Sequence, residues 1–118
     1  MDAENTERLH KLLMEERELL RQQLRDLGVN PDDPSSVEIR VDPGFADSAQ
    51  TTAERNRLLS IARGLRTNLD DVEHALGRIE AGTYGTCERC GKGIALERLE
   101  AVPFARLCID CKREVGAR

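Results

Sequence analysis

Residues 87–111 read CERCGKGIALERLEAVPFARLCIDC, and this stretch decides how the chain can fold. It contains two Cys-x-x-Cys pairs, Cys87 with Cys90 and Cys108 with Cys111, separated by seventeen residues. Each pair can turn back on itself so that its sulfurs converge, and Zn²⁺ takes four thiolates in a tetrahedron at about 2.3 Å. Because a catalytic zinc keeps one position open for water, four cysteines predict one closed, structural zinc site.

A thiol redox protein is the alternative, since a single Cys-x-x-Cys pair would allow it. Residues 1–12 show no apolar run of the kind a signal peptide has, and no stretch approaches the roughly 20 apolar residues of a membrane span. We therefore expect a cytoplasmic protein, in which thiols stay reduced and paired cysteines favour a metal over disulfides.

Residues 82–118 are expected to form a small C4 zinc-finger domain that ends in a short helix. Few large apolar residues are available there, so metal binding should supply much of the folding energy. The expected apolar cluster consists of Ile94, Leu96, Leu99, Val102, Phe104 and Leu107.

Upstream of the finger, two segments carry apolar residues at the spacing of packed helices. In the segment at about 51–81 they step by four and three through three heptads: Leu58, Ala62, Leu65, Leu69, Val72, Leu76 and Ile79. In the segment at about 4–27 they are Leu9, Leu13, Leu20, Leu24 and Leu27, with Leu12 and Leu19 expected to widen the stripe. Together they predict a mainly α fold, an antiparallel two-helix coiled-coil hairpin over residues 1–81.

The helix ends also have signals in the sequence. Gly28 is a candidate stop for the first helix. Ser48 or Thr51 can cap the second, and Thr51 with Glu54 has the form of a capping box. Two helices of similar length bury their seams most simply by folding on each other, which gives a monomer. Pairing between two chains remains the alternative.

The connector at residues 28–50 concentrates the acidity of the chain. Its five acids and one arginine give −4, equal to the formal net charge of the whole protein. That net charge and the scarcity of aromatic residues argue against general nucleic-acid binding, which needs many cations or stacking rings. A zinc-finger DNA-binding module that acts without other proteins remains the alternative function.

His10 and His74 are expected on solvated helix faces. Neither has a neighbouring partner in the sequence that suggests catalysis, so no catalytic residue and no enzymatic activity are predicted.

The finger segment resembles the zinc-finger signature of the DksA/TraR family. The matching residues are Tyr84-Gly85-Thr86-Cys87-Glu88-Arg89-Cys90-Gly91, Ile94, Arg98-Leu99-Glu100-Ala101-Val102-Pro103 and Leu107-Cys108-Ile109-Asp110-Cys111-Lys112. The resemblance implies a regulator that binds bacterial RNA polymerase rather than DNA. Its coiled coil would enter the secondary channel of the enzyme and bring an acidic tip near the catalytic magnesium.

The tip of such proteins carries the pattern Asp-x-x-Asp-x-Ala. Here Asp47 and Ala49 match the second acid and the alanine, Gly44 stands where the first acid belongs, and Asp42 lies two residues earlier. The resemblance therefore implies that Asp42, Asp47 and Ala49 contact the polymerase. The alternative is that Asp47 only caps the second helix.

The resemblance also bears on guanosine tetraphosphate, which basic residues near the end of the hairpin and in the zinc domain help to hold in related proteins. Aligned on the cysteines, two of those positions are Asp71 and Val102, and Lys112 remains. Dependence on this alarmone is not expected.

Overall fold

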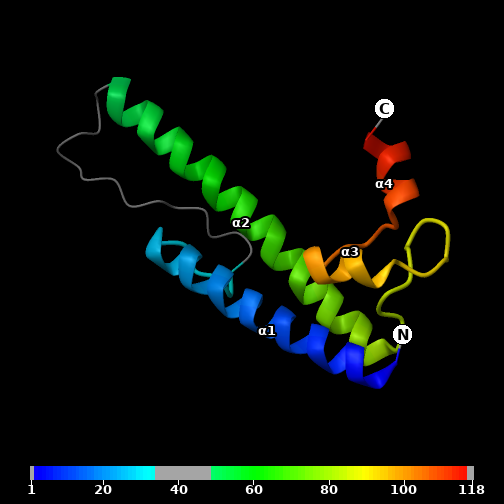
Figure 1. Ribbon diagram of the computed structural model, residues 1–118. Coiled ribbons are helices and arrows are strands. Elements are labelled where there is room, and N and C mark those ends of the chain that lie inside the picture. Colours follow the sequence, from blue (N-terminus) through cyan, green and yellow to red (C-terminus); the bar gives the residue numbers. More distant parts are fainter. Residues whose placement is uncertain (1, 34–48, 117–118) are drawn as a thin grey trace. The chain divides into compact units, whose positions relative to one another are not determined.

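The computed structural model describes residues 2–33 and 49–116, which are mainly α-helical (Figure 1). The helices are α1 (Ala3–Asp26), α2 (Ala49–Ala81), α3 (Leu96–Ala101) and α4 (Ile109–Gly116). Among these residues β pairing is limited to an isolated antiparallel bridge between Thr86 and Gly93. No helix in the described part of the chain combines the length and apolar character needed to cross a membrane. The predicted fold class is confirmed: two long helices pair as a hairpin, and a cysteine cluster and a short final helix follow.

The starts of the two long helices differ slightly from the prediction. α1 begins after Asp2, whose Oδ1 accepts a hydrogen bond of 2.8 Å from a backbone N–H of the first turn. α2 begins two residues before its predicted start, so Thr51 lies inside the helix and does not cap it. Glu54 pairs instead with Arg57 at 2.9 Å. The predicted capping box is therefore wrong, and Ser48 lies outside the described residues.

The chain forms two compact units, Met1–Arg17 with Asp71–Arg118, and Glu18–Asp70. In the first unit, the beginning of α1 runs antiparallel to the end of α2. The buried side chains of this seam are Leu9, Leu13, Val72 and Ala75. Each buried leucine contributes about 2 kcal/mol. The partly exposed ion pair of Arg17 with Glu73, at 3.5 Å, contributes less than about 1 kcal/mol.

In the second unit, the end of α1 packs antiparallel against the part of α2 that contains Ala62 and Leu69. The buried apolar side chains are Leu20, Leu24, Ala62 and Leu69, which belong to the predicted seams, and Val29, which follows α1. The buried stripe of α1 is narrower than predicted, because Leu12 and Leu19 are 37% and 54% exposed.

The two long helices have 24 residues in α1 and 33 in α2, close to the bounds predicted from the sequence. Within the second unit, the turn after α1 meets α2 at Arg66. Residues 49–65 of α2 precede that point, which is about 25 Å of helix. Residues 52–57 are exposed throughout. The beginning of α2 therefore has no stretch of α1 opposite it (Figure 1).

The compact units do not follow the boundaries of the sequence motifs. Both long helices pass from one unit into the other, α1 after Arg17 and α2 at Asp71. The division into a hairpin domain at 1–81 and a finger domain at 82–118 stays a prediction from the sequence.

The C-terminus of α1 confirms Gly28 as its stop. Gly28 has φ of +84°, a left-handed conformation that side chains disfavour. Its N–H donates to the Arg25 carbonyl at 2.9 Å, and the Val29 N–H donates to the Leu24 carbonyl at 2.9 Å. This pair of bonds is a Schellman motif, and the buried side chains of Leu24 and Val29 provide the apolar contact that accompanies it.

Two glycine substitutions should shift stability in opposite directions. Gly28→Ala should lower the free energy of unfolding by about 1 kcal/mol, because alanine strains the left-handed position. Gly64→Ala should raise it by about 0.5–1 kcal/mol, because Gly64 lies inside α2 with nothing within 4 Å of an added Cβ. Urea unfolding of the zinc-loaded protein measures both. Equal effects of the two substitutions would contradict the assigned helix end.

Candidate metal centre

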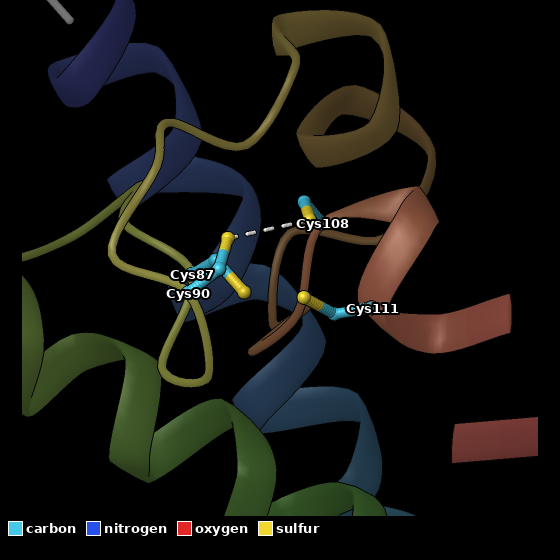
Figure 2. A group of neighbouring side chains, drawn as sticks. All are labelled: Cys87, Cys90, Cys108 and Cys111. Carbon is cyan, nitrogen blue, oxygen red and sulfur yellow. Dashed lines mark hydrogen bonds between the residues drawn. The ribbon is translucent and has the colours of Figure 1, made fainter. Parts of the chain in front are cut away.

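Four cysteine sulfurs converge on one point (Figure 2). The Sγ atoms of Cys87, Cys90, Cys108 and Cys111 all lie within 4.8 Å of one another, and none of the four forms a disulfide. The sulfurs of Cys90 and Cys108 are 3.8 Å apart. A tetrahedron with zinc–sulfur bonds of about 2.3 Å has edges of about 3.8 Å. The spacing and the soft donor set both fit one tetrahedral Zn²⁺ ion.

The first Cys-x-x-Cys pair is held by a tight backbone turn. The Cys87 N–H donates to the Lys92 carbonyl at 2.8 Å, and the Gly91 N–H donates back to the Cys87 carbonyl at 3.0 Å. Gly91 has φ of +78°, which lets the chain reverse directly after Cys90. These bonds point both thiols of the pair to the same side.

The second pair is placed by the start of α4. Cys108 immediately precedes the helix, and Cys111 lies in its first turn. The Lys112 N–H donates to the Cys108 carbonyl at 2.9 Å, which closes that turn. The start of α4 therefore places both sulfurs of the second pair on the side that faces the first pair.

The pKa values of the two buried thiols diverge. Burial by itself raises the pKa of Cys87. Hydrogen bonds from the backbone N–H groups of Cys108, Cys90 and Arg89 and from the Cys90 thiol together outweigh burial and lower that pKa to about 6. Burial, followed by the neighbouring thiols, raises the pKa of Cys111 to about 12. Four thiolates so close together repel one another, and a bound dication reverses that penalty.

An apolar cluster supports the cysteines from behind. Its buried members are Leu9, Cys87, Ile94, Leu99 and Cys111, with Tyr84, Leu96, Ala105, Leu107 and Cys108 packed against them. Four residues of the predicted cluster belong to it, whereas Val102 and Phe104 line a groove beside it. The sequence reasoning missed Leu9, because its heptad position indicates only that it is buried, not which segment covers it.

The two residues between Cys87 and Cys90 tie the first turn to helices. Glu88 accepts a 2.9 Å contact from His74 of α2, and Arg89 donates to Glu114 of α4 at 2.5 Å. His74 is therefore not the purely solvated residue that the sequence suggested. No periodicity or spacing in the sequence predicts that these residues contact each other.

The remaining residues singled out by the sequence are placed only in part. Asp42 and Asp47 lie outside the described residues, and Ala49 is the first residue of α2. Asp71, Val102 and Lys112 line one groove with a volume of about 630 Å³ in the first unit. In that groove the Asp71 carboxylate accepts a hydrogen bond of 2.7 Å from Arg106.

Comparison with known proteins gives one consistent result. Residues 82–115 match the prokaryotic dksA/traR C4-type zinc finger. The chain is 30% identical over 115 residues to general stress protein 16O of Bacillus subtilis, which covers 98% of this chain and 71% of that protein. It is 47% identical over 47 residues to the RNA polymerase-binding transcription factor DksA of Escherichia coli, covering 40% of this chain but only 31% of DksA. The structure of transcription factor DksA2 from Pseudomonas aeruginosa superposes on the whole chain and on 88% of that protein, with a TM-score of 0.78 and 27% identity.

Metal removal should unfold the first unit. The purified protein should contain one zinc ion per chain. Removing it with a chelator should abolish cooperative unfolding of the part that contains Leu9 and Leu99, because structural zinc contributes on the order of 10 kcal/mol. Elemental analysis and NMR of the leucine methyl groups measure both effects.

Substitution of one ligand tests the four-sulfur site directly. Cys108→Ser should lose tight zinc binding, whereas the control Ser60→Ala should keep it. Full zinc retention by Cys108→Ser would contradict the four-sulfur site.

Tyr84 offers a spectroscopic check on the packing around the centre. Its hydroxyl donates to the Pro103 carbonyl at 2.7 Å, and burial raises the pKa of Tyr84 to about 12. Since this folded-state pKa lies above the unfolded value of about 10, its stabilising contribution is complete below about pH 10 and is lost as pH rises towards 12.

Tyr84 is the only tyrosine and there is no tryptophan, so the absorbance of the phenolate reports on it alone. The titration midpoint should fall from about 12 to about 10 when the protein is unfolded in urea. A midpoint near 10 in protein still folded by circular dichroism would refute the buried hydroxyl, and Tyr84→Phe supplies the blank.

Proposed function

Because this chain belongs to the DksA/TraR family of C4 zinc-finger proteins, we propose that it is a transcription regulator that binds bacterial RNA polymerase. We propose further that its coiled coil enters the secondary channel of the enzyme and presents acids at its tip near the active centre. In this proposal one structural zinc ion is bound by Cys87, Cys90, Cys108 and Cys111 and serves the fold. The family is one of transcription factors, which supports a regulatory rather than a catalytic role.

The observation that carries the proposal is the length of α2 beyond its pairing with α1. About 20 Å of helix, residues 49–61, precedes the buried Ala62; residues 52–57 are exposed, and the acidic connector comes directly before this part of α2 in the sequence. A narrow helix of that length suits a channel better than a flat surface. Negative charge carried at its start suits a site that holds a metal cation.

The start of α2 also bears on the alternative role of Asp47. Since the helix begins at Ala49, the residue directly before it is Ser48. The preferred side-chain cap is the residue next to the first helical one, and Asp47 lies outside the described residues, so capping by Asp47 stays the alternative. A contact with the polymerase remains the better use of this acid.

Two other expectations belong to the same proposal. Residues 87–118 carry seven basic and five acidic side chains, and four thiolates around one dication leave the finger near neutral, which gives little attraction for a DNA backbone. Asp71, placed opposite Arg106 in the groove, makes that groove less favourable for a polyphosphate. The protein should act in the bacterial cytoplasm, on the polymerase, without direct DNA binding and without guanosine tetraphosphate.

Asp47→Asn tests the tip. Zinc-loaded protein should co-elute with core RNA polymerase on a sizing column, and Asp47→Asn should co-elute equally. Its effect on transcription in vitro should fall at least tenfold, because neutralising the acid removes the charge aimed at the active centre. Glu38→Gln, an acid of the same connector outside the tip pattern, is the matched control and should regulate fully.

The outcomes separate the candidate functions. Absence of wild-type protein from the polymerase peak, with zinc present, would overturn the proposed partner. Full regulation by Asp47→Asn would overturn the tip mechanism alone. Salt-dependent binding of duplex DNA without polymerase would favour the DNA-binding module instead.

A further inference from the structure

The residues that follow Gly28 at the end of α1, residues 29–33, have a defined conformation. After the Schellman motif, Val29 is buried and residues 30–33 form a turn. The Asp33 N–H donates to the Asn30 carbonyl at 3.2 Å, and the Asp32 N–H donates to the Asn30 side chain at 3.0 Å. Pro31 in the middle of the turn is buried. These four residues have a defined backbone course immediately before the acidic part of the connector.

One side chain from α2 holds three carbonyls of this turn. The guanidinium of Arg66 donates to the carbonyl oxygens of Pro31 at 2.7 Å, Asn30 at 2.8 Å and Asp33 at 3.0 Å. The planar fork of arginine can aim several N–H groups at once, whereas the single ammonium of lysine cannot reproduce that geometry. A charged donor also makes each bond stronger than a neutral one.

A second arginine holds the turn from α1. Arg21 lies 2.8 Å from the Asp32 carboxylate, and its side chain is only 12% exposed. The turn is thus tied to both helices of the second unit, by its carbonyls to Arg66 and by a carboxylate to Arg21. Thirty-five residues separate Pro31 from Arg66 in the sequence, so this contact is tertiary and not a local cap.

Partly burying Arg66 against the turn has an energetic cost that a loop serving only as a connection would not require. The Nε atom of Arg66 is buried without a hydrogen-bond partner among the described residues. An unpaired buried donor is unfavourable. A solvated connector would avoid this cost by leaving Arg66 in water. The contacts do, however, fix the point on α2 from which residues 34–48 start, while the start of α2 at Ala49 fixes the other end of that segment.

We propose that Arg66 is a positioning residue for the acidic tip. By donating hydrogen bonds to the carbonyls of Asn30, Pro31 and Asp33, it fixes the point at which residues 34–48 leave the hairpin. This inference rests on the proposed function at the polymerase. The fifteen residues 34–48 would reach about 50 Å if fully extended, twice the roughly 25 Å of α2 that precedes Arg66. Without a fixed origin, Asp42 and Asp47 would sample many positions, and few of them would lie at the active centre.

The test compares Arg66→Gln and Arg66→Lys with Arg63→Gln. Arg63 lies three residues away on the same helix and is exposed, so its substitution makes the same change of charge without touching the turn. Hydrogen exchange of the Val29, Asp32 and Asp33 amides in the free protein should become about tenfold faster in both Arg66 variants and stay unchanged in Arg63→Gln. Melting temperature measured alongside shows that each variant is folded.

Polymerase experiments then separate positioning from simple stability. All variants should co-elute with core polymerase, while the transcriptional effect of both Arg66 variants should fall about tenfold. Phe45→p-benzoylphenylalanine, placed in each background, should crosslink to one polymerase peptide in the wild type and to several in the Arg66 variants. A loss of stability alone would lower the crosslinking yield without changing the peptide.

Each result decides the matter. Unchanged exchange, or full regulation with a single crosslinked peptide in Arg66→Gln, would overturn the positioning role. Rescue of all readouts by Arg66→Lys would also overturn it, because charge alone would then suffice. Failure of the wild type to co-elute would instead overturn the proposed function, and the exchange rates would still show whether Arg66 holds the turn.

Discussion

Convergence of four sulfurs on a single point is the constraint on which the finger and the base of the hairpin both depend. Besides the cysteines themselves, the segment that carries them has few buried apolar side chains of its own, namely Ile94 and Leu99. Ordering some thirty residues costs far more than two such side chains return, at roughly 1–2 kcal/mol per residue for the backbone alone. A closed tetrathiolate zinc site supplies the difference, and it does so only when both cysteine pairs are brought together.

The metal centre also contacts both long helices in the first unit. Leu9 of α1 is fully buried in the same apolar cluster as Cys87 and Cys111, and Glu88 reaches His74 of α2. In the first unit the centre is therefore part of the hairpin base and not an appendage to it. In the second unit the helices are joined differently, by buried leucines and by two arginines around a turn.

Local signals explain what the sequence could predict. The two Cys-x-x-Cys pairs specify a metal site by themselves, the heptad spacing specifies the seams of Leu13 and Leu69, and Gly28 marks a helix end because it alone tolerates a left-handed backbone there. Each of these properties depends on residues close together in the chain. The family resemblance rests on the same local pattern around the cysteines.

The remaining features depend on residues far apart in the chain. The exposure of Leu12 and Leu19 depends on which side of α1 its partners cover, and periodicity alone does not predict that side exactly. The hydrogen bond between His74 and Glu88 joins positions fourteen residues apart through a turn at the zinc site. Arg66 donates hydrogen bonds to three backbone carbonyls. Every residue has a backbone carbonyl, so the residue types do not reveal which ones Arg66 contacts. For such contacts the amino-acid sequence shows which residues could take part but not which residues contact each other.

The burial of Leu9 among the cysteines has a consequence for how the chain reaches its fold. Arg8 and Glu100, one residue from that cluster on either element, are 92 residues apart. During synthesis, the first turns of α1 leave the ribosome long before the finger exists, so their apolar stripe must wait in water or on a chaperone. Such high contact order slows folding. Completion of the first unit is thus deferred until the last cysteine has emerged and a zinc ion has been captured, which links the yield of folded protein to the zinc supply of the cell.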